Sequence, residues 1–236
     1  KLSKKSVSIV ELSSFQLQDL KKSPNLAIIL DIYEEHLDKH KSFEEYLSAK
    51  SNIVRFQKKS DAVIYAGENK FSKKLGAFSK GEKMPFTLNK AKALGYRLKL
   101  SGEHNYKNVM AARLAAKLFG VSEKVIKDVS ESFRGIAHRL EFTRELKGVR
   151  FYNDSKATNV GSALAGINAF KENKVVIVGG LNKNLNLKPL ARRLRKPDIS
   201  FVVLFGKARD EISKELRGFS RFERVRNLRG ALALAN

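Results

Sequence analysis

The chain has 236 residues, with 47 Lys and Arg against 24 Asp and Glu, which gives a formal net charge of +23. This length is sufficient for one large or two ordinary packed domains, and 42% apolar residues beside 30% charged ones exclude a disordered or membrane-embedded class. Cys is absent, which excludes disulfides, thiolate catalysis and cysteine-based zinc sites.

Short apolar runs alternate with amphipathic stretches in the first half, a pattern that predicts parallel strands joined by crossover helices. We expect strands at residues 7–12, 25–30 and 61–66. A helix is expected to begin after Ser42, with Glu45 at the spacing of a capping box. Lys50 falls on or beside the apolar stripe of this helix, which is an unusual place for an amine. Between residues 70 and 100, scattered Gly and Pro predict a small antiparallel patch.

The second half repeats the alternation. Helices are expected at 105–119 and 122–133, and the break in periodicity at 134–138 predicts a boundary between a domain of residues 1–136 and one of 137–236. Lys147-Gly148 predicts a hairpin between strands 140–146 and 149–153. A second α/β unit follows, with strands at 175–179 and 201–205 and helices at 162–170, 187–194, 208–216 and 231–235. The predicted class is α/β in two domains.

The positive charge is spread along the chain in isolated pairs such as Lys21-Lys22 and Arg192-Arg193, which favours a solvated basic surface over a nucleic-acid interface. A basic nucleic-acid-binding module remains the alternative, and its binding would fall steeply with salt. No apolar stretch approaches the roughly 20 residues that span a bilayer, and the sequence from Lys1 onward does not begin with the hydrophobic segment of a signal peptide. We therefore expect a cytoplasmic protein without membrane insertion.

Polar residues that follow the predicted strands are the first candidates for chemistry, because open α/β sheets bind ligands at the carboxyl ends of their strands. Glu11 and His36 offer a carboxylate and an imidazole to a cation, although ordinary polar loops explain them equally well. Lys50 is either a reactive amine with a lowered pKa or a lysine that reaches solvent along its stem.

Two further positions suit a nucleotide. Asp154 provides a carboxylate for ribose hydroxyls, and Arg139 provides a planar guanidinium for phosphate or base. The pair Gly179-Gly180 lets a backbone approach a ligand closely. The phosphate-binding pattern G-x-x-x-x-G-K-[ST] does not occur in these 236 residues.

Six strings together resemble the Mur ligase family, and within it the branch that adds D-glutamate. The strings are Glu-Leu-Ser-Ser-Phe-Gln-Leu at 11–17, Glu-His-Leu-Asp-Lys-His at 35–40, Ala-Lys at 49–50, Gly-Glu-His-Asn-Tyr-Lys-Asn at 102–108, His-Arg at 138–139 and Asn-Asp-Ser-Lys-Ala-Thr-Asn at 153–159. Their order and approximate spacing match over essentially the whole chain. The resemblance implies a partial central P-loop-type α/β domain followed by a partial Rossmann-like C-terminal domain.

The resemblance also implies a two-step reaction of a monomeric enzyme. ATP phosphorylates the carboxylate of UDP-N-acetylmuramoyl-L-alanine, and the D-glutamate amine then attacks the acyl phosphate, with two Mg²⁺ ions on the phosphates. The implied metal ligands are Glu11, His36 and a carbamylated Lys50. The implied nucleotide ligands are Asn105, Asn108, Arg139 and Asp154. Ser13, Thr158 and Lys183 would bind substrate, and Lys50, His36 and Lys156 would be catalytic.

The chain also departs from the family pattern. Asp31 and Glu35 stand where Asn and Asp usually precede the metal histidine, and Leu181-Asn182 replaces a pair that contains a carboxylate. By this resemblance we expect that the uridine-binding domain and the ATP loop are not among these 236 residues, and we therefore expect no turnover by these residues alone. The alternatives within the same chemistry are a sister Mur ligase or a folylpolyglutamate synthase-type amide ligase.

Overall fold

A computed structural model describes residues 6–34, 40–181 and 185–235 of the chain. The chain forms two compact units, the first of Lys1–Ile32 and His40–Phe86 and the second of Tyr33–Lys39 and Thr87–Asn236. Each unit contains a three-stranded parallel sheet, which confirms the predicted α/β class. Within the described ranges, no helix is both long enough and apolar enough to cross a bilayer.

The sheet of the first unit has the order β1-β2-β3, with β1 at Leu26–Ile29, β2 at Ala62–Ala66 and β3 at Glu82–Phe86. The strands expected at 25–30 and 61–66 are therefore confirmed. The predicted antiparallel patch is wrong, because β3 pairs in parallel with β2. Helix α3 (Lys70–Ala77) makes the crossover that a parallel pair requires.

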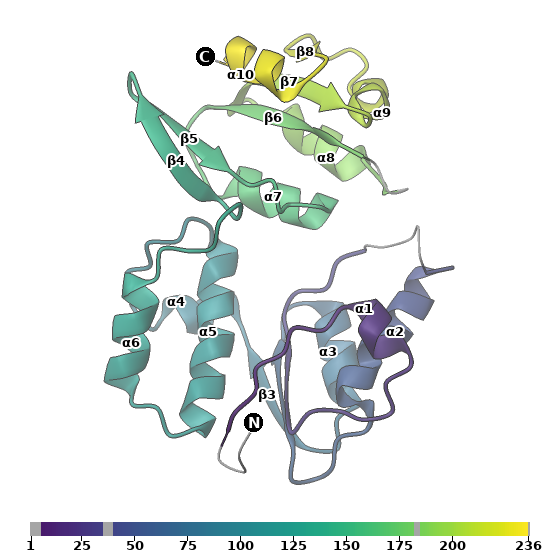
Figure 1. The fold of residues 1–236 in the computed structure, drawn as a ribbon, viewed down its shortest axis with the longest axis vertical. Coiled ribbons are helices and arrows are strands. Elements are labelled where there is room, and N and C mark those ends of the chain that lie inside the picture. The colour runs from purple at the N-terminus through teal and green to yellow at the C-terminus, as the bar shows by residue number, and fades with distance from the viewer. Residues whose placement is uncertain (1–5, 35–39, 182–184, 236) are drawn as a thin grey trace. The chain divides into compact units, whose positions relative to one another are not determined.

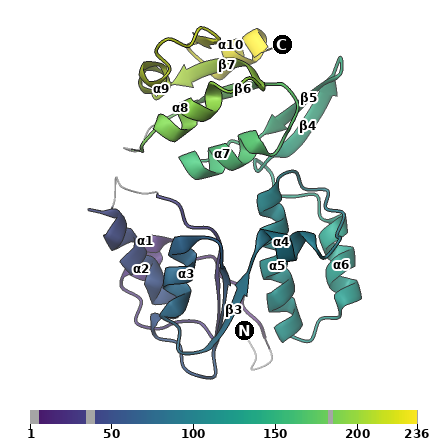
Figure 2. The same ribbon diagram turned by 180° about the vertical axis from the view of Figure 1, so that it is seen from behind.

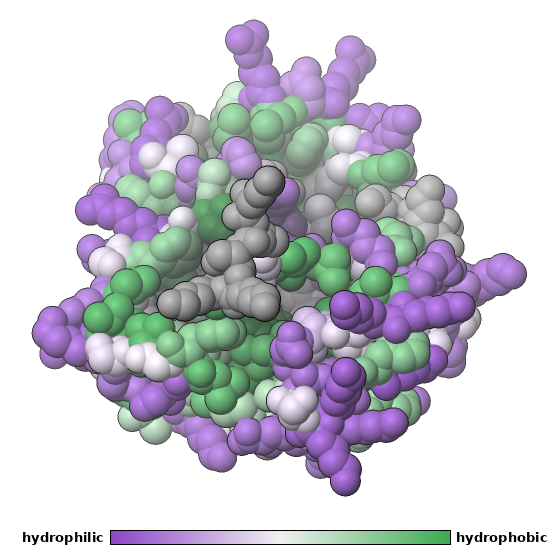
Figure 3. All heavy atoms as spheres, turned by 60° about the horizontal axis from the view of Figure 1, so that its bottom comes forward, coloured by the Kyte–Doolittle hydropathy of each residue, from purple (hydrophilic) through white to green (hydrophobic). Residues whose placement is uncertain are grey.

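The strand expected at 7–12 is also wrong. Residues 6–13 have no regular secondary structure and lead into the short helix α1 (Ser14–Gln18). Their alternating sequence suits a strand, but a strand also needs a neighbour for its backbone groups, and none of the described strands pairs with this segment. Ile9 is consequently 96% exposed. Figure 3 shows apolar residues in green reaching the surface on one face of the molecule.

Helix α2 (Phe43–Arg55) begins as predicted after Ser42, whose hydroxyl accepts a hydrogen bond from the backbone N–H of Glu45 at 3.2 Å. The carboxylate of Glu45 accepts from the N–H of Lys41 at 2.6 Å, so only one half of the expected capping box forms. α1 packs on α2, α2 on α3, and α3 on β2. The buried core of this unit contains Ala27, Ile29, Ile32, Tyr46, Leu47, Val54, Val63 and Leu75.

The second unit begins with the helices α4 (Leu88–Lys92), α5 (Glu103–Leu118) and α6 (Glu123–Ser132), and the two longer ones confirm the helices predicted at 105–119 and 122–133. Glu123, the first residue of α6, connects these elements. Its carboxylate accepts hydrogen bonds from Nε and Nη2 of Arg113 on α5, at 2.7 and 2.9 Å. It also accepts one from the buried Tyr96 hydroxyl. These donors lower the pKa of Glu123 to about 2.

We expect Glu123→Gln to lower the free energy of unfolding at pH 7 by about 1 kcal/mol, a value discounted for the partial exposure of the carboxylate. Because the folded pKa lies below the unfolded value of 4.5, the stabilisation is present above about pH 4.5 and is lost as the pH falls toward 2. Urea unfolding between pH 2.5 and 7 measures the difference. Asp128→Asn, which removes an exposed partner of Lys124, is the control and should change little.

A hairpin of β4 (Glu141–Leu146) and β5 (Val149–Asn153) follows, as predicted. The two turn residues Lys147 and Gly148 have φ angles of 49° and 78°. Positive φ at both central positions is the signature of a type I′ turn, whose twist matches that of the two strands. The register of the pair shifts between Phe142 and Arg144.

The rest of the second unit is a parallel α/β module in which the predicted strands and helices are confirmed and one short strand is added. Its sheet order is β6-β7-β8, and Figures 1 and 2 show α8 and α10 on opposite sides of this sheet. The elements are α7 (Val160–Asn168), β6 (Lys174–Gly180), α8 (Lys188–Leu194), β7 (Ile199–Gly206), α9 (Arg209–Glu215), β8 (Phe222–Arg224) and α10 (Leu228–Ala235). The core includes the fully buried Leu194, Ile199, Val202, Leu204 and Leu216.

Asp198 ties the amino ends of β6 and β7 together. Its carboxylate accepts from Nζ of Lys174 at 2.6 Å and from two nitrogens of Arg193 at 2.8 and 2.6 Å, while its backbone carbonyl accepts the N–H of Lys174 at 3.0 Å. These cations hold the pKa of Asp198 far below its usual range. One carboxylate thus links the start of both strands to the end of α8.

Candidate functional site

The loop that precedes the hairpin is held against the end of β5. His138 and Leu140 have φ angles of 68° and 46°, a left-handed backbone conformation that residues other than glycine rarely adopt. Nδ1 of His138 lies 2.9 Å from Nδ2 of Asn153, and the N–H of Leu140 donates to Oδ1 of Asp154 at 3.0 Å. The N–H of Lys156 donates to the His138 carbonyl at 3.0 Å. Contacts from the Asn153–Asn159 string therefore fix the backbone on both sides of Arg139.

Asp154 lies at the centre of this arrangement and is partly buried. An added Cβ on Gly166 of α7 would lie 2.4 Å from Oδ2 of Asp154, so glycine at this position leaves room for the carboxylate. Burial raises the pKa of Asp154, and the Leu140 N–H and the positive charges of His104 and Arg139 oppose that rise. The predicted nucleotide residues Asp154 and Arg139 thus interact electrostatically.

We expect Asp154→Asn to be at least as stable as the parent chain at pH 7. The folded pKa of Asp154 is raised above 3.8, so the charged carboxylate costs stability, and the free energy of unfolding from this group falls as the pH rises from about 4. Asparagine keeps an acceptor for Leu140 and carries no charge. Urea unfolding at pH 4 and pH 7 tests this, with the exposed Asp19→Asn as control. A clear loss of stability in Asp154→Asn at pH 7 would contradict the expected cost of burial.

The start of α5 carries the predicted residues Asn105 and Asn108. Nδ2 of Asn105 donates to the Ser101 carbonyl at 2.7 Å, and Nδ2 of Asn108 donates to Oδ1 of Asn105 at 3.2 Å. The preceding Gly102 has a φ of 95°, and a Cβ there would meet the His104 ring at 2.7 Å. The two amides therefore form one hydrogen-bonded set beside His104, whose charge acts on Asp154.

The Asn153–Asn159 string is the loop from β5 to α7, and its two asparagines have structural roles. Oδ1 of Asn153 accepts the N–H of Ser155 at 3.1 Å, and Oδ1 of Asn159 caps α7 by accepting the N–H of Ser162 at 2.8 Å. Lys156 and Thr158 are exposed between these anchors. The loop is thus fixed at both ends and presents an amine and a hydroxyl to solvent.

In the first unit, the predicted residues Glu11 and Ser13 lie at the start of α1, and both are exposed. Ser13 caps α1 in a complete capping box with Gln16, with hydrogen bonds of 2.9 and 3.3 Å. This local role accounts for Ser13 without any substrate. Glu11 is exposed two residues before this cap.

The amine of Lys50 lies 5.0 Å from the centre of the Tyr46 ring, one helical turn earlier on α2, and the residue is partly buried. Tyr46 meets the ring of His40 edge to face, with centroids 5.5 Å apart. His40 is 3% exposed, and its Nε2 lies 2.9 Å from the hydroxyl of Ser14 on α1. Lys50 is thereby connected through two aromatic side chains to the helix that follows Glu11.

Sequence periodicity could not identify His40, Tyr46 and Asn52 as the residues that join α1 to α2. Nδ2 of Asn52 donates to the carbonyls of Leu17 and Gln18 at 2.9 and 3.1 Å, across more than 30 residues of sequence. Only the i, i+4 spacing of Tyr46 and Lys50 is visible in the sequence.

Two predicted site residues, His36 and Lys183, lie outside the described residues. In the described ranges, no group of three or more His, Cys, Asp or Glu side chains could hold a metal ion. Glu11 has the hard oxygen donor that Mg²⁺ prefers, whereas the Lys50 amine fits a cation only after conversion to an anionic carbamate. The described donors therefore fit a magnesium site in part.

The pair Gly179-Gly180 ends β6, and its first glycine serves strand packing. A Cβ on Gly179 would lie 2.0 Å from the carbonyl oxygen of Phe205 on β7. Gly180 has a φ of 110° and open space around it, and its carbonyl accepts the N–H of Ala208 at 2.8 Å. Only Gly180 therefore presents open backbone of the kind that the sequence predicted for both.

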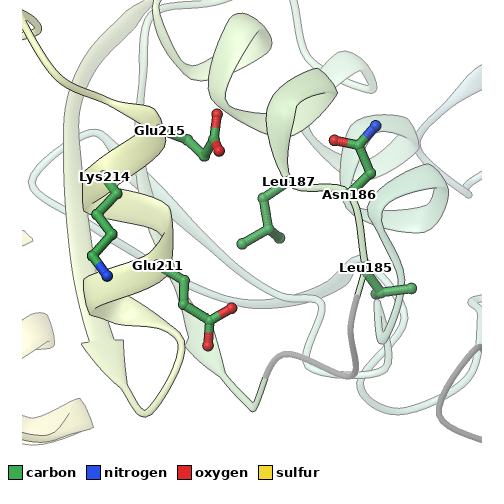
Figure 4. A pocket seen from close by; sticks show the side chains of 6 residues that line it. All are labelled: Leu185, Asn186, Leu187, Glu211, Lys214 and Glu215. Carbon is green, nitrogen blue, oxygen red and sulfur yellow. The ribbon is translucent and has the colours of Figure 1, made fainter.

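A pocket of about 280 Å³ lies between α9 and the segment that leads into α8. Figure 4 shows Glu211 and Glu215 of α9 on one side and Leu187 and Asn186 on the other. Leu185 and Lys214 complete its lining. None of the described candidate residues lines this pocket.

The sequence matches two family models. Residues 2–87 match the Mur ligase middle domain, and residues 138–236 match the glutamate ligase domain of the Mur ligases. The chain is 35% identical over 231 residues to a protein of Acetivibrio thermocellus named UDP-N-acetylmuramoylalanine–D-glutamate ligase, and the alignment covers 89% of this chain and 49% of that protein. The chain thus spans about half the length of the curated relatives it matches.

Solved structures share the fold. MurF from Acinetobacter baumannii superposes with a TM-score of 0.73 at 20% identity, covering 94% of this chain and 54% of that one. MurF ligase from Thermotoga maritima, solved in complex with ADP, superposes with a TM-score of 0.65 at 15% identity, covering 86% of this chain and 52% of that one.

Proposed function

Because the chain belongs to the Mur ligase family, we propose that it supplies two domains, residues 1–136 and 137–236, of an ATP-dependent ligase of peptidoglycan precursor synthesis. The reaction is addition of D-glutamate to UDP-N-acetylmuramoyl-L-alanine through an acyl phosphate. The arrangement around Asp154 carries the proposal, because hydrogen bonds anchor the loop there and the Asp154 carboxylate interacts electrostatically with the Arg139 guanidinium. We propose a cytoplasmic monomer, in keeping with diffusible nucleotide substrates.

The proposed nucleotide ligands come from three elements of the second unit. Asp154 accepts hydrogen bonds from the ribose hydroxyls, and Arg139 donates to phosphate or stacks on the base. Asn105 and Asn108 present amides to adenine, which needs both donors and acceptors. The left-handed backbone at His138 and Leu140 fixes the position of Arg139 before ATP binds, which lowers the entropy lost on binding.

Lys156, Thr158 and Lys183 are the proposed ligands of the acyl phosphate and of the D-glutamate carboxylates. Two of them are exposed on the loop that Asn153 and Asn159 anchor. An ammonium group and a hydroxyl make charge-assisted hydrogen bonds with carboxylate and phosphate oxygens. Lys156 stabilises the negative charge that develops as the amine attacks the acyl carbon. Ser13 remains a proposed substrate ligand, although its hydroxyl already caps α1.

Glu11, His36 and a carbamylated Lys50 are the proposed ligands of two Mg²⁺ ions. When bound, these ions neutralise the phosphate oxygens and align the substrate carboxylate for in-line transfer. For Lys50, the ammonium first loses a proton to solvent, and the neutral amine then forms a C–N bond with CO₂ and releases a second proton. A cation is thereby converted into a carboxylate-like anion. The contact between Tyr46 and Lys50 orients the lysine stem along α2.

The test is a ligase assay on the longest open reading frame that encodes these residues. We expect ATP hydrolysis and a new amide product with UDP-N-acetylmuramoyl-L-alanine and D-glutamate, and D-glutamate should win in competition with other amino acids. Preference for another amino acid would favour a sister ligase, and a pteroyl acceptor would favour a folylpolyglutamate synthase-type enzyme. The 236 residues alone, which lack the phosphate-binding pattern, should show no turnover.

A further inference from the structure

We propose that the carboxyl ends of β7 and β8 form a second anion site that binds the phosphate or diphosphate group of a small molecule. We call it the arginine pocket, and its lining residues are Arg209, Asp210, Arg224, Val225 and Arg226. Its volume is about 280 Å³. Among the described residues, none of those assigned to the ligase reaction lines it.

The position of the arginine pocket in the sheet favours ligand binding. Arg224 is the last residue of β8, and Val225 and Arg226 follow it directly. Arg209 begins α9, three residues after β7 ends at Gly206. The N–H of Val225 donates to the carbonyl of Leu204 on β7 at 2.8 Å, which holds the exit of β8 beside β7. Open parallel sheets bind their ligands at this edge.

Asp210 fixes two of the three guanidinium groups. Its Oδ1 lies 3.1 Å from Nη1 of Arg224 and 3.7 Å from Nε of Arg209. Nη1 of Arg209 also donates to the carbonyl of Val225 at 3.2 Å. Each guanidinium has five N–H donors, so these contacts orient both groups and leave most of their donors for a ligand. An oriented donor set loses little side-chain entropy on binding.

The charge of the pocket matches a phosphate dianion. Three arginines and one aspartate give 3 − 1 = +2. Arg226 has no hydrogen-bond or ion-pair partner in the part of the chain that the structure describes. Guanidinium groups bind phosphate oxygens bidentately, and a second arginine adds affinity for a doubly charged group.

The size of the pocket selects a small ligand rather than a polymer. Its volume of about 280 Å³ lies just below the range of typical ligand pockets, which run from roughly 300 to 1,000 Å³. A nucleic-acid strand would instead need an extended basic groove with aromatic platforms for its bases. The described lining contains no aromatic residue. A phosphate or diphosphate group on a compact metabolite therefore fits the arginine pocket best.

The probe is sodium pyrophosphate, titrated into the 236-residue chain by calorimetry at low ionic strength, with inorganic phosphate in a parallel series. We expect saturable binding by calorimetry. In NMR spectra of the same titration, we expect chemical-shift changes at the backbone amides of Arg209, Arg224, Val225 and Arg226. Tighter binding of pyrophosphate than of phosphate would assign a diphosphate ligand, and equal binding a single phosphoryl group. Absence of binding, or shift changes confined to other residues, would overturn the proposal.

Two variants of equal charge separate this site from general attraction to a basic chain. Arg224→Gln/Arg226→Gln should weaken pyrophosphate binding by about tenfold or more. Arg192→Gln/Arg217→Gln removes two exposed arginines of the same module and should change the affinity by less than about twofold. Equal losses in both variants would refute a defined site. Arg226→Gln alone removes a side chain that has no partner among the described residues, and it should weaken binding without changing the thermal midpoint.

Discussion

Gly179→Ala should lower the free energy of unfolding of the second unit by about 3 kcal/mol or more. The new methyl group would lie 2.0 Å from the carbonyl oxygen of Phe205 and 2.9 Å from Cδ1 of its ring. Gly179 pairs with Phe205 in the ladder between β6 and β7, so neither backbone can move without loss of sheet hydrogen bonds. Urea unfolding followed by far-UV circular dichroism measures the effect.

Gly218→Ala is the matched control in the same module. Gly218 has a φ of 76° and no atom within 4 Å of an added Cβ, so only left-handed strain applies, about 1 kcal/mol. A loss in Gly179→Ala no larger than that in Gly218→Ala would show that the strands adjust to the methyl group. In that case the glycine at position 179 would be explained by the close approach of a ligand to the backbone, as the sequence predicts.

Lys50→Arg should reduce the kcat of the proposed ligase reaction by at least about 100-fold in the protein encoded by the longest open reading frame that contains these residues. Arginine keeps the positive charge and can remain over the Tyr46 ring, but its guanidinium does not add CO₂. Lys50→Ala should lose activity to the same extent. Steady-state assays with saturating ATP, Mg²⁺ and D-glutamate measure the loss.

Lys74→Arg, at an exposed position near the end of α3, is the control for lysine replacement and should keep full activity. Thermal unfolding of each variant separates loss of chemistry from loss of fold. If the kcat of Lys50→Arg lies within about twofold of the parent value, a carbamate at Lys50 is excluded. The contact of a positive charge with the Tyr46 ring then explains why a lysine stands at this position.

The sequence predicts most elements of the second unit correctly, because hydrophobic periodicity and turn residues agree there. Lys147-Gly148 is such a case, since the turn needs positive φ at both positions and both residues adopt it. The sequence does not predict β3 and α3, and this failure has a different cause. Gly76 looks like a turn signal, but it lies inside α3, where a Cβ would be 2.8 Å from the Tyr65 ring. Glycine there serves packing, which no local pattern distinguishes from a turn.

The candidate site is predicted from motif strings, and the structure adds what holds them in place. The string Asn153–Asn159 identifies a loop, yet only the fold shows that Asn153 and Asn159 anchor it and that Gly166 leaves room for Asp154. The contact of His40 with Ser14 joins residues 26 positions apart. Tertiary contacts of this kind leave no periodic signal, so the sequence could not reveal the connection between α1 and Lys50.

Asp198 stabilises only one of the two edges of the β6-β7-β8 sheet, the edge formed by the amino ends of the strands. At the amino edge, ionic hydrogen bonds link Lys174, Arg193 and Asp198, whereas Gly180 and Arg224 end β6 and β8 at the carboxyl edge. The ionic contacts at the amino edge hold the sheet together without any residue from the carboxyl edge. We therefore expect the loops that follow β6, β7 and β8 to tolerate changes of sequence, in evolution or in design for a new acceptor, while the sheet keeps its shape.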